Sequence, residues 1–335
     1  LEGTSFVLQE EATPASVGGA LAHALRSASA EGVSPRLVLF CDRGAGVAAR
    51  LVRRFDMDVE VRSVFEASSV PAEPDPLPVI VPGPEGVDPL LEQLESRGLE
   101  VVLEDGSYRG ELLGLEVARI ALWPTETGGD GEYHLEPGVG RFDRDAAAAM
   151  HEGESPADGL ERALRIVTRR RHAGAGTHPL SLLSRARWLR ADAIADPGRV
   201  GAARLDAVQT SFPPDSVREE SPAAALGVDA SGEPLLVVFG SGAGLDLVPV
   251  AADTRGLQAP GARLRVVVPG RDHMAVTEEL AAKLHTPAEV VEFEPGWGRV
   301  GTQEHRMRKR LEQLASEFRN CEAQLADTEV VADRE

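Results

Sequence analysis

Short apolar runs alternate with amphipathic segments in two separate regions of the chain. The apolar runs of the first region lie at 36–40, 77–82 and 99–103, and those of the second at 235–239, 264–268 and 289–293. Segments with helical spacing of apolar residues follow four of them, at 47–55, 87–97, 245–255 and 276–284, and a fifth such segment precedes the first run, at 14–31. Such alternation is typical of a parallel sheet covered by helices. We therefore predict an α/β fold.

The two regions share two sequence blocks in the same order. Residues 37–46 resemble 235–244, because an apolar run meets a glycine-rich turn in both. Residues 79–106 resemble 266–296, since both contain a Val-Pro-Gly turn, an amphipathic helix and a Glu-Val-Val strand. Two blocks in one order favour two similar Rossmann-like parallel-sheet units related by internal duplication. The alternative is two unrelated α/β units.

These patterns divide the chain into four segments. Residues 1–145 are expected to form the first Rossmann-like unit with a β-hairpin extension, whose two strands lie at 110–123 and 132–139. Residues 201–298 are expected to form the second unit, which begins with a Pro-rich, polar linker at 201–223. An Arg-rich helical connector is expected at 146–200, where Ser155 and Pro156 mark a helix start. A C-terminal amphipathic helix and tail occupy 299–335.

The tail has apolar residues at alternating spacings of four and three. This heptad seam predicts either a homodimer through 302–325 or a helix that docks on its own chain. Its members are Met307, Leu311, Leu314, Phe318, Cys321 and Leu325.

Composition limits the classes of function. The chain of 335 residues carries 35 basic and 54 acidic residues, a net charge of −19, which disfavours non-specific coating of nucleic acid. No apolar run approaches the ~20 residues of a membrane span. Two cysteines make no disulfide framework, so we expect a cytoplasmic protein. The eight histidines show no metal-ligand spacing, and we predict no metal and no cofactor.

Positive charge is concentrated in one stretch, residues 162–190. It contains eight arginines and no acidic residue, and we call it the arginine belt. Arg169, Arg170 and Arg171 are candidate ligands for phosphate, because guanidinium groups match phosphate and carboxylate geometry. The alternative is that the belt pairs with the acidic residues of the chain itself. Nucleic acid is an unlikely partner of the belt, although one that the sequence does not exclude.

Two glycine turns are candidate anion sites. Each lies where an apolar strand passes into a helix, so free backbone N–H groups point at a potential anion. The candidate ligand-binding residues are Arg43, Gly44, Gly46, Gly240, Ser241, Gly242 and Gly244. Neither turn has the full spacing of a dinucleotide or P-loop motif, and a purely structural tight turn is the alternative.

Residues 15–105 resemble the sugar isomerase (SIS) domain family. The resemblance rests on a leading helix, LVLFCDRGAG, the strand DVEVRSV, and VIVPGPEGVDPLLEQLESRG. It implies that a phosphosugar binds between paired modules. The segments that match the phosphate loops of the family, 42–46 and 83–87, contain no hydroxyl side chain.

The second region is also similar to a restriction-endonuclease-like module. The order of hairpin, helix, strand, helix and strand carries this resemblance, with Asp229 near the hairpin turn. The acidic-x-Lys motif of such modules would fall near Phe239 and Ser241, and it is absent. The resemblance therefore implies a catalytically inactive copy.

Together these features lead to one main expectation and two alternatives. We expect a protein that binds an anionic, phosphate-bearing small molecule at the cleft between two α/β units, without an evident set of catalytic residues. The alternatives are an enzyme of the sugar-phosphate isomerase type, and a catalytically inactive nuclease-like or scaffold protein. Whether a reaction is catalysed is not decided by these motifs.

Overall fold

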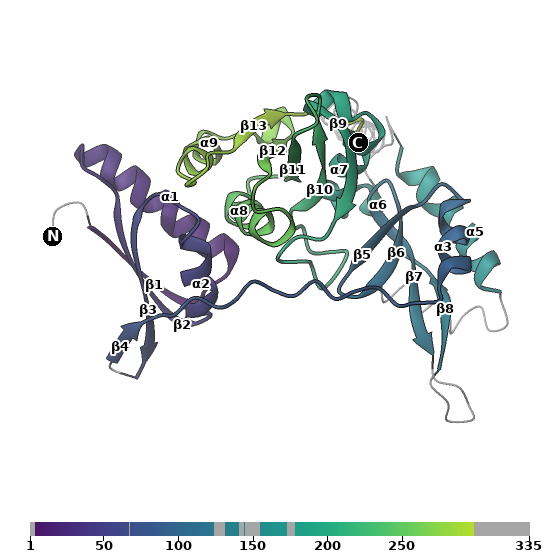
Figure 1. Cartoon of the computed structure of the whole chain (residues 1–335), viewed down its shortest axis with the longest axis horizontal. Helices are drawn as coiled ribbons and strands as arrows, with labels where there is room; N and C mark the ends of the chain where they lie inside the picture. The colour runs from purple at the N-terminus through teal and green to yellow at the C-terminus, as the bar shows by residue number, and fades with distance from the viewer. Residues whose placement is uncertain are drawn as a thin grey trace, which may run out of the picture.

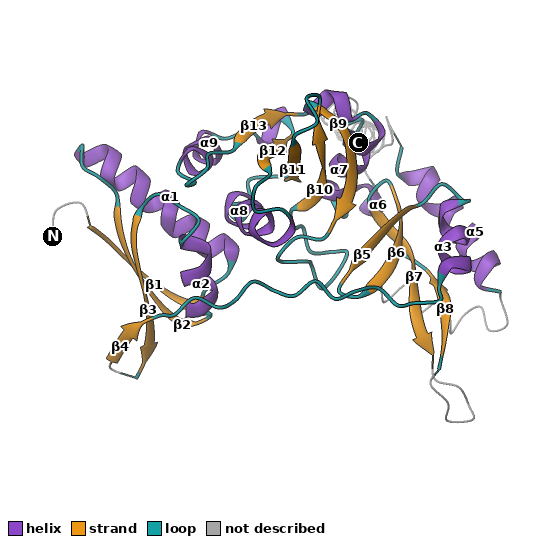
Figure 2. Ribbon diagram, viewed as in Figure 1, coloured by secondary structure: helices purple, strands orange, loops and turns teal. Residues whose placement is uncertain are grey.

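The computed structural model describes residues 4–66, 68–123, 131–140, 144, 155–172 and 178–297. Within these residues the chain is mixed α/β with three separate sheets (Figure 1). The third sheet in chain order lies between the other two (Figure 2). The chain therefore runs from one end of the molecule to the other, through an extended segment at 72–87, and then returns to the middle.

The first unit has a four-stranded sheet in the order β1-β2-β3-β4. Strands β1 to β3 are parallel, and β4 is antiparallel to β3. Thr13 caps the first helix, because its side chain accepts a hydrogen bond from the Ser16 N–H at 3.2 Å. The elements are β1 (Thr4–Glu11), α1 (Pro14–Glu31), β2 (Arg36–Arg43), α2 (Ala45–Val52), β3 (Asp58–Phe65) and β4 (Ser68–Pro71).

The second unit of the structure is not the second unit expected from the sequence, because it precedes residue 201. It has an antiparallel sheet in the order β5-β6-β7-β8. Helix α5 packs its apolar side chains against β7 and β8, and Leu160 and Val167 are fully buried there. The Ser155 side chain accepts a hydrogen bond from the Asp158 N–H and so caps α5, as predicted. The elements are α3 (Asp88–Glu95), β5 (Glu100–Glu104), β6 (Ser107–Leu112), β7 (Leu115–Trp123), β8 (Glu132–Pro137), α5 (Pro156–Arg170) and α6 (Pro179–Leu182).

The third unit has a five-stranded sheet in the order β13-β12-β11-β10-β9, with β11 to β13 parallel. Helix α7 packs on one face and α8 and α9 on the other, so the central strand β11 is buried on both faces. The elements are α7 (Arg185–Ala195), a 3-10 helix (Pro197–Val200), β9 (Ala202–Val208), β10 (Ala223–Asp229), β11 (Pro234–Phe239), α8 (Leu247–Gln258), β12 (Arg263–Val268), a 3-10 helix (Gly270–Asp272), α9 (Ala275–Ala282) and β13 (Glu289–Glu292).

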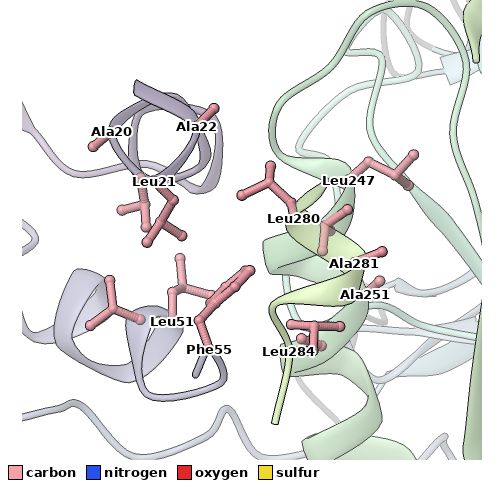
Figure 3. Close-up of a cluster of buried hydrophobic side chains, with 14 of the residues drawn as sticks. Ala20, Leu21, Ala22, Leu51, Phe55, Leu247, Ala251, Leu280, Ala281 and Leu284 are labelled. Atoms are coloured by element: carbon pink, nitrogen blue, oxygen red, sulfur yellow. The ribbon is translucent and has the colours of Figure 1, made fainter. Parts of the chain in front are cut away.

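The first and third units share one hydrophobic core. Leu21 of α1 and Leu51 of α2 face Ala251 of α8 and Leu280 of α9 across it (Figure 3). Phe55 pairs with Leu284 in an isolated antiparallel bridge between the units. The space between these two units is therefore filled by side chains at this contact.

The structure differs from several of the sequence expectations. No strand forms at 77–82, where the chain is extended coil that crosses between units. The strand expected over 110–123 is two strands, because Leu113 and Gly114 form a tight turn with positive φ. Residues 202–208, expected in a linker, form the edge strand β9.

The sheets also divide the chain differently from the expected boundaries. Residues 1–145 span two sheets, because β5 to β8 form a separate sheet among the described strands. Within the expected connector, α5 packs on the second sheet and α7 on the third. The Rossmann-like duplication is not confirmed, because the segment 79–106 contributes to the linker and the antiparallel sheet, whereas 266–296 belongs to the third unit.

Two further expectations concern membranes and the tail. Among the described residues, no helix has both the length and the apolar character that crossing a membrane requires. The heptad seam from Met307 to Leu325, with the predicted homodimer through 302–325, lies outside the described residues.

Candidate functional site

Three glutamates of the second sheet are almost completely buried. Glu104, Glu111 and Glu116 have 4%, 1% and 2% of their surface exposed. Glu111 lies directly opposite Glu116 on β7 and opposite Glu100 on β5, so the sheet register brings these carboxylates together. Buried carboxylates of like charge require positive partners.

Arginines of α7 supply these partners from the third unit. Arg187 donates to Glu111 Oε1 at 2.6 Å and to Glu104 Oε1 at 2.7 Å, and Arg190 donates to Glu111 Oε2 at 2.6 Å. Burial alone would raise the pKa of Glu111, but Arg190 and Arg187 together lower it below its usual range. Part of the arginine belt is therefore neutralised by the acidic residues of the chain itself, the alternative weighed above.

A cavity of about 880 Å³ lies beside this ion-pair network. Strands β6 and β7 contribute Arg109, Glu116 and Arg119, and α7 contributes Arg187. The segment 214–218, which connects β9 to β10, closes another side. The cavity thus lies between the second unit and the start of the third. The remaining described residues that line it are Val139, Gly140, Arg144, Ala163, Ile166, Pro179, Leu180, Leu183 and Ser184.

One carboxylate on this wall is shared by three arginines. Arg119 Nε lies 3.2 Å from Glu116 Oε1 and Arg109 Nη1 lies 3.6 Å from Glu116 Oε2, while Arg144 Nη1 donates to Glu116 as well. Arg109 also pairs with Glu104 and Asp105, and Arg144 with Glu136, but each guanidinium has five N–H donors and these carboxylates do not accept from all of them. The Nε atom of Arg109 is buried and has no hydrogen-bond partner.

The described lining is positively charged. It contains five arginines, at 109, 119, 144, 187 and 218, against Glu116 and Asp215. Glutamates behind the wall pair with three of these arginines: Glu104 with Arg109 and Arg187, Glu111 with Arg187, and Glu136 with Arg144. Burial lowers the pKa of Arg144, although Glu116 opposes this effect. The guanidinium groups that line the cavity thus outnumber the carboxylates that line it, and this arrangement favours an anionic occupant.

The predicted residues Arg169 and Arg170 lie in the last turn of α5, with exposed side chains. Ile166 of the same helix lines the cavity, and Arg162 and Arg170 lie one turn before and after it in the same helical row. These side chains therefore extend the positive charge of the cavity onto the helix surface.

The third predicted arginine of this group has a different environment. Arg171 is buried, and its guanidinium donates to the carbonyl oxygens of Leu113, Leu180, Leu183 and Ser184 at 2.7 to 3.1 Å. Burial lowers its pKa to about 10. Its guanidinium also stacks over the Trp188 ring at 4.4 Å. Arg171 therefore connects chain segments, and its Nε, Nη1 and Nη2 atoms all donate hydrogen bonds within the protein.

The first glycine turn lies at the start of α2, in the first unit. Gly44 has a φ of 72°, a conformation that glycine adopts readily. The linker residue Asp75 covers this turn, since a Cβ atom on Gly46 would lie 2.2 Å from Asp75 Oδ1. Arg43 is exposed and forms ion pairs with Glu10 and Glu11. The carboxylate of Asp75 thus lies against this turn, and its negative charge disfavours a bound anion there.

The second glycine turn, in the third unit, lines a smaller cavity of about 250 Å³. Its neighbours are acidic, because Glu220 and Asp246 line the same cavity and burial raises the pKa of both carboxyl groups. The Gly242 N–H donates to Asp272 at 2.8 Å. This environment disfavours an anion. The predicted residues that line it are Gly240, Ser241, Gly242 and Gly244.

The structure therefore places the predicted residues at three separate sites: the first glycine turn, the second glycine turn and the C-terminal end of α5. Arg109, Glu116, Arg119 and Arg144, which carry most of the charge of the larger cavity, were not predicted from the sequence. One signal was available, because charged residues interrupt an otherwise apolar stretch at 109–119.

The comparisons with known proteins supply no assignment. No protein-family model matches the chain, and neither the curated proteins nor the solved structures yielded a match. The function is therefore inferred from the geometry of the cavity.

Proposed function

We propose that this protein binds an anionic, phosphate-bearing small molecule in the cavity between the second and third units. The observation that carries the proposal is the convergence of Arg109, Arg119 and Arg144 on the single carboxylate of Glu116. Guanidinium donors left over from this arrangement match the oxygens of a phosphate or carboxylate group. The volume of about 880 Å³ falls within the range of small-molecule pockets.

The ion-pair network behind the cavity supports binding in a second way. Arg187 contacts both Glu104 and Glu111, so its guanidinium is fixed before any ligand arrives. Donors that are already oriented lose little conformational entropy on binding. The exposed arginines of α5 would draw an anion toward the cavity through long-range attraction.

Arg119→Gln tests the proposal directly. The Arg119 side chain is 32% exposed, so its replacement removes a donor with little effect on folding. We expect wild-type protein to bind ethyl phosphate in isothermal titration calorimetry, and the variant to bind about tenfold more weakly, since a hydrogen bond to a charged group contributes roughly 1.5–3 kcal/mol.

Arg204→Gln is the matched control. Its side chain is 76% exposed on β9 and pairs with Asp206, away from the cavity lining. Its affinity for ethyl phosphate should equal that of the wild type. Equal affinities of all three proteins, or no binding to the wild type, would contradict the proposed function.

A further inference from the structure

The lining of the large cavity separates into two chemical classes according to the elements that supply it. The arginines come from β6, β7, α7, position 144 and position 218. The apolar side chains come from α5, from α6 with its flanking residues, and from three loop positions. They are Val139, Ala163, Ile166, Pro179, Leu180, Leu183, Pro214 and Val217.

The cavity is larger than an inorganic anion requires. Its volume of about 880 Å³ equals about 30 volumes of liquid water, whereas phosphate has only five heavy atoms. A phosphate held by Arg109, Arg119 and Arg144 would leave the apolar part of the lining in contact with water. Burying apolar surface is favourable, so a ligand with an apolar body gains affinity from this part.

The apolar part of the lining favours an aliphatic body. Its members are aliphatic residues and prolines, and none of the described residues that line the cavity has an aromatic ring. Stacking on aromatic side chains is the common way in which proteins hold a base or another flat ring. Ile166 is 48% exposed and lies at the cavity, so an aliphatic chain could cover it.

We infer that the ligand is an amphiphilic anion, with a phosphate or carboxylate head on an aliphatic chain. This inference rests on the proposed function, because the arginine wall must first hold the head group. The chain then lies along Ile166, Leu180, Leu183 and Val217, and the head contacts Arg109, Arg119 and Arg144.

A series of alkyl phosphates tests the inference. Ethyl, butyl, hexyl and octyl phosphate are titrated into the full chain below their micelle-forming concentrations. Each added methylene should lower the dissociation constant up to about fourfold, the equivalent of ~0.8 kcal/mol per buried methylene, until the chain fills the cavity. Octanoate in place of octyl phosphate shows whether a carboxylate head is accepted as well.

Two variants separate the contributions of head and chain. Ile166→Ser should reduce the dependence on chain length and leave ethyl phosphate affinity unchanged. Arg119→Gln should weaken every anion by the same factor and leave the dependence on chain length intact. Both side chains are partly exposed, and circular dichroism melting checks that both variants fold.

The possible outcomes distinguish the two proposals. If ethyl and octyl phosphate bind with equal affinity and Arg119→Gln weakens both, the inference of an amphiphilic ligand is wrong and the proposed anion site stands. Binding of octanol or octyltrimethylammonium as tightly as octyl phosphate overturns the anion site. Absence of binding by every phosphate and by octanoate overturns both.

Discussion

Arg187 and Glu111 lie 2.6 Å apart, 76 residues apart in the chain, and both are nearly inaccessible to water. The pair joins α7 of the third unit to β6 of the second unit. Removing one partner of a buried pair leaves a charge without compensation, and this costs far more than the pair itself contributes.

Arg187→Ala should therefore destabilise the protein severely. It removes one guanidinium contact from each of Glu104 and Glu111, which keep Arg109 and Arg190 as their other partners, and we expect a loss of about 3 kcal/mol in the free energy of unfolding. Urea denaturation measures this loss. Arg204→Ala, at an exposed ion pair, should change the free energy by less than about 1 kcal/mol. If Arg187→Ala lowers the free energy of unfolding as little as Arg204→Ala does, the ion-pair network does not stabilise the fold.

The second prediction concerns the turn between β6 and β7. Gly114 and Gly98 both have a φ near +72°, so alanine at either position adopts a strained backbone at a cost of ~1–2 kcal/mol. A Cβ atom on Gly114 would also lie 2.2 Å from the carbonyl carbon of Arg187, whereas one on Gly98 would meet no atom within 4 Å.

Gly114→Ala should therefore lower the melting temperature more than Gly98→Ala does, and it should also weaken ethyl phosphate binding, because α7 must move. Differential scanning calorimetry and titration calorimetry measure the two effects. Equal melting temperatures for the two variants would refute the close approach of this turn to α7.

The third prediction concerns the contact between the first and third units. Phe55 is 2% exposed in the shared core and bridges to Leu284. Phe55→Ala should cost about 3–5 kcal/mol and increase hydrogen exchange in α8 and α9, because it removes packing that both units share. Phe65→Ala, 73% exposed, is the control and should leave exchange in these helices unchanged. Unchanged exchange in Phe55→Ala would mean that the units fold without this contact.

A fourth prediction concerns pH. Hydrogen bonds with Glu292 at 2.6 Å and Glu278 at 2.8 Å raise the pKa of His273 above its ordinary value of 6.5. A raised pKa in the folded state means that the stabilisation is fully present below pH 6.5 and is lost as the pH rises through the folded pKa.

NMR titration of His273 measures this shift, and denaturation at a series of pH values measures its effect on stability. Glu292→Gln should lower the pKa of His273 more than Glu278→Gln does, because the hydrogen bond with Glu292 has the larger effect. An unshifted His273 in the wild type would disprove the arrangement.

Local patterns predicted many of the elements. The helix expected at 14–31 is α1, and the hairpin expected from Ala224 to Phe239 is β10 and β11. Asp229 organises that turn, since its Oδ1 accepts from the Ser231 and Glu233 N–H groups. Helical spacing, caps and turn residues act over a few neighbours, so a reader of the sequence can recognise them.

Errors occurred where a local pattern was ambiguous. The apolar run at 77–82 resembles a strand, but no neighbouring strand pairs with it. Strand β9 has only Ala202 and Leu205 buried, so its residues resemble a polar linker. Whether such segments pair depends on partners that are distant in the chain.

The residues of the candidate site were likewise predicted only in part from the sequence. The sequence by itself established the α/β class, most helices and the concentration of arginine at 162–190. Only the tertiary structure decided that Arg187 and Arg190 are buried against glutamates, that Arg171 binds carbonyl oxygens, and that Arg109 and Arg119 line a cavity. The reason is physical, because the partner of a charged side chain depends on strand register and on the docking of units far apart in the chain.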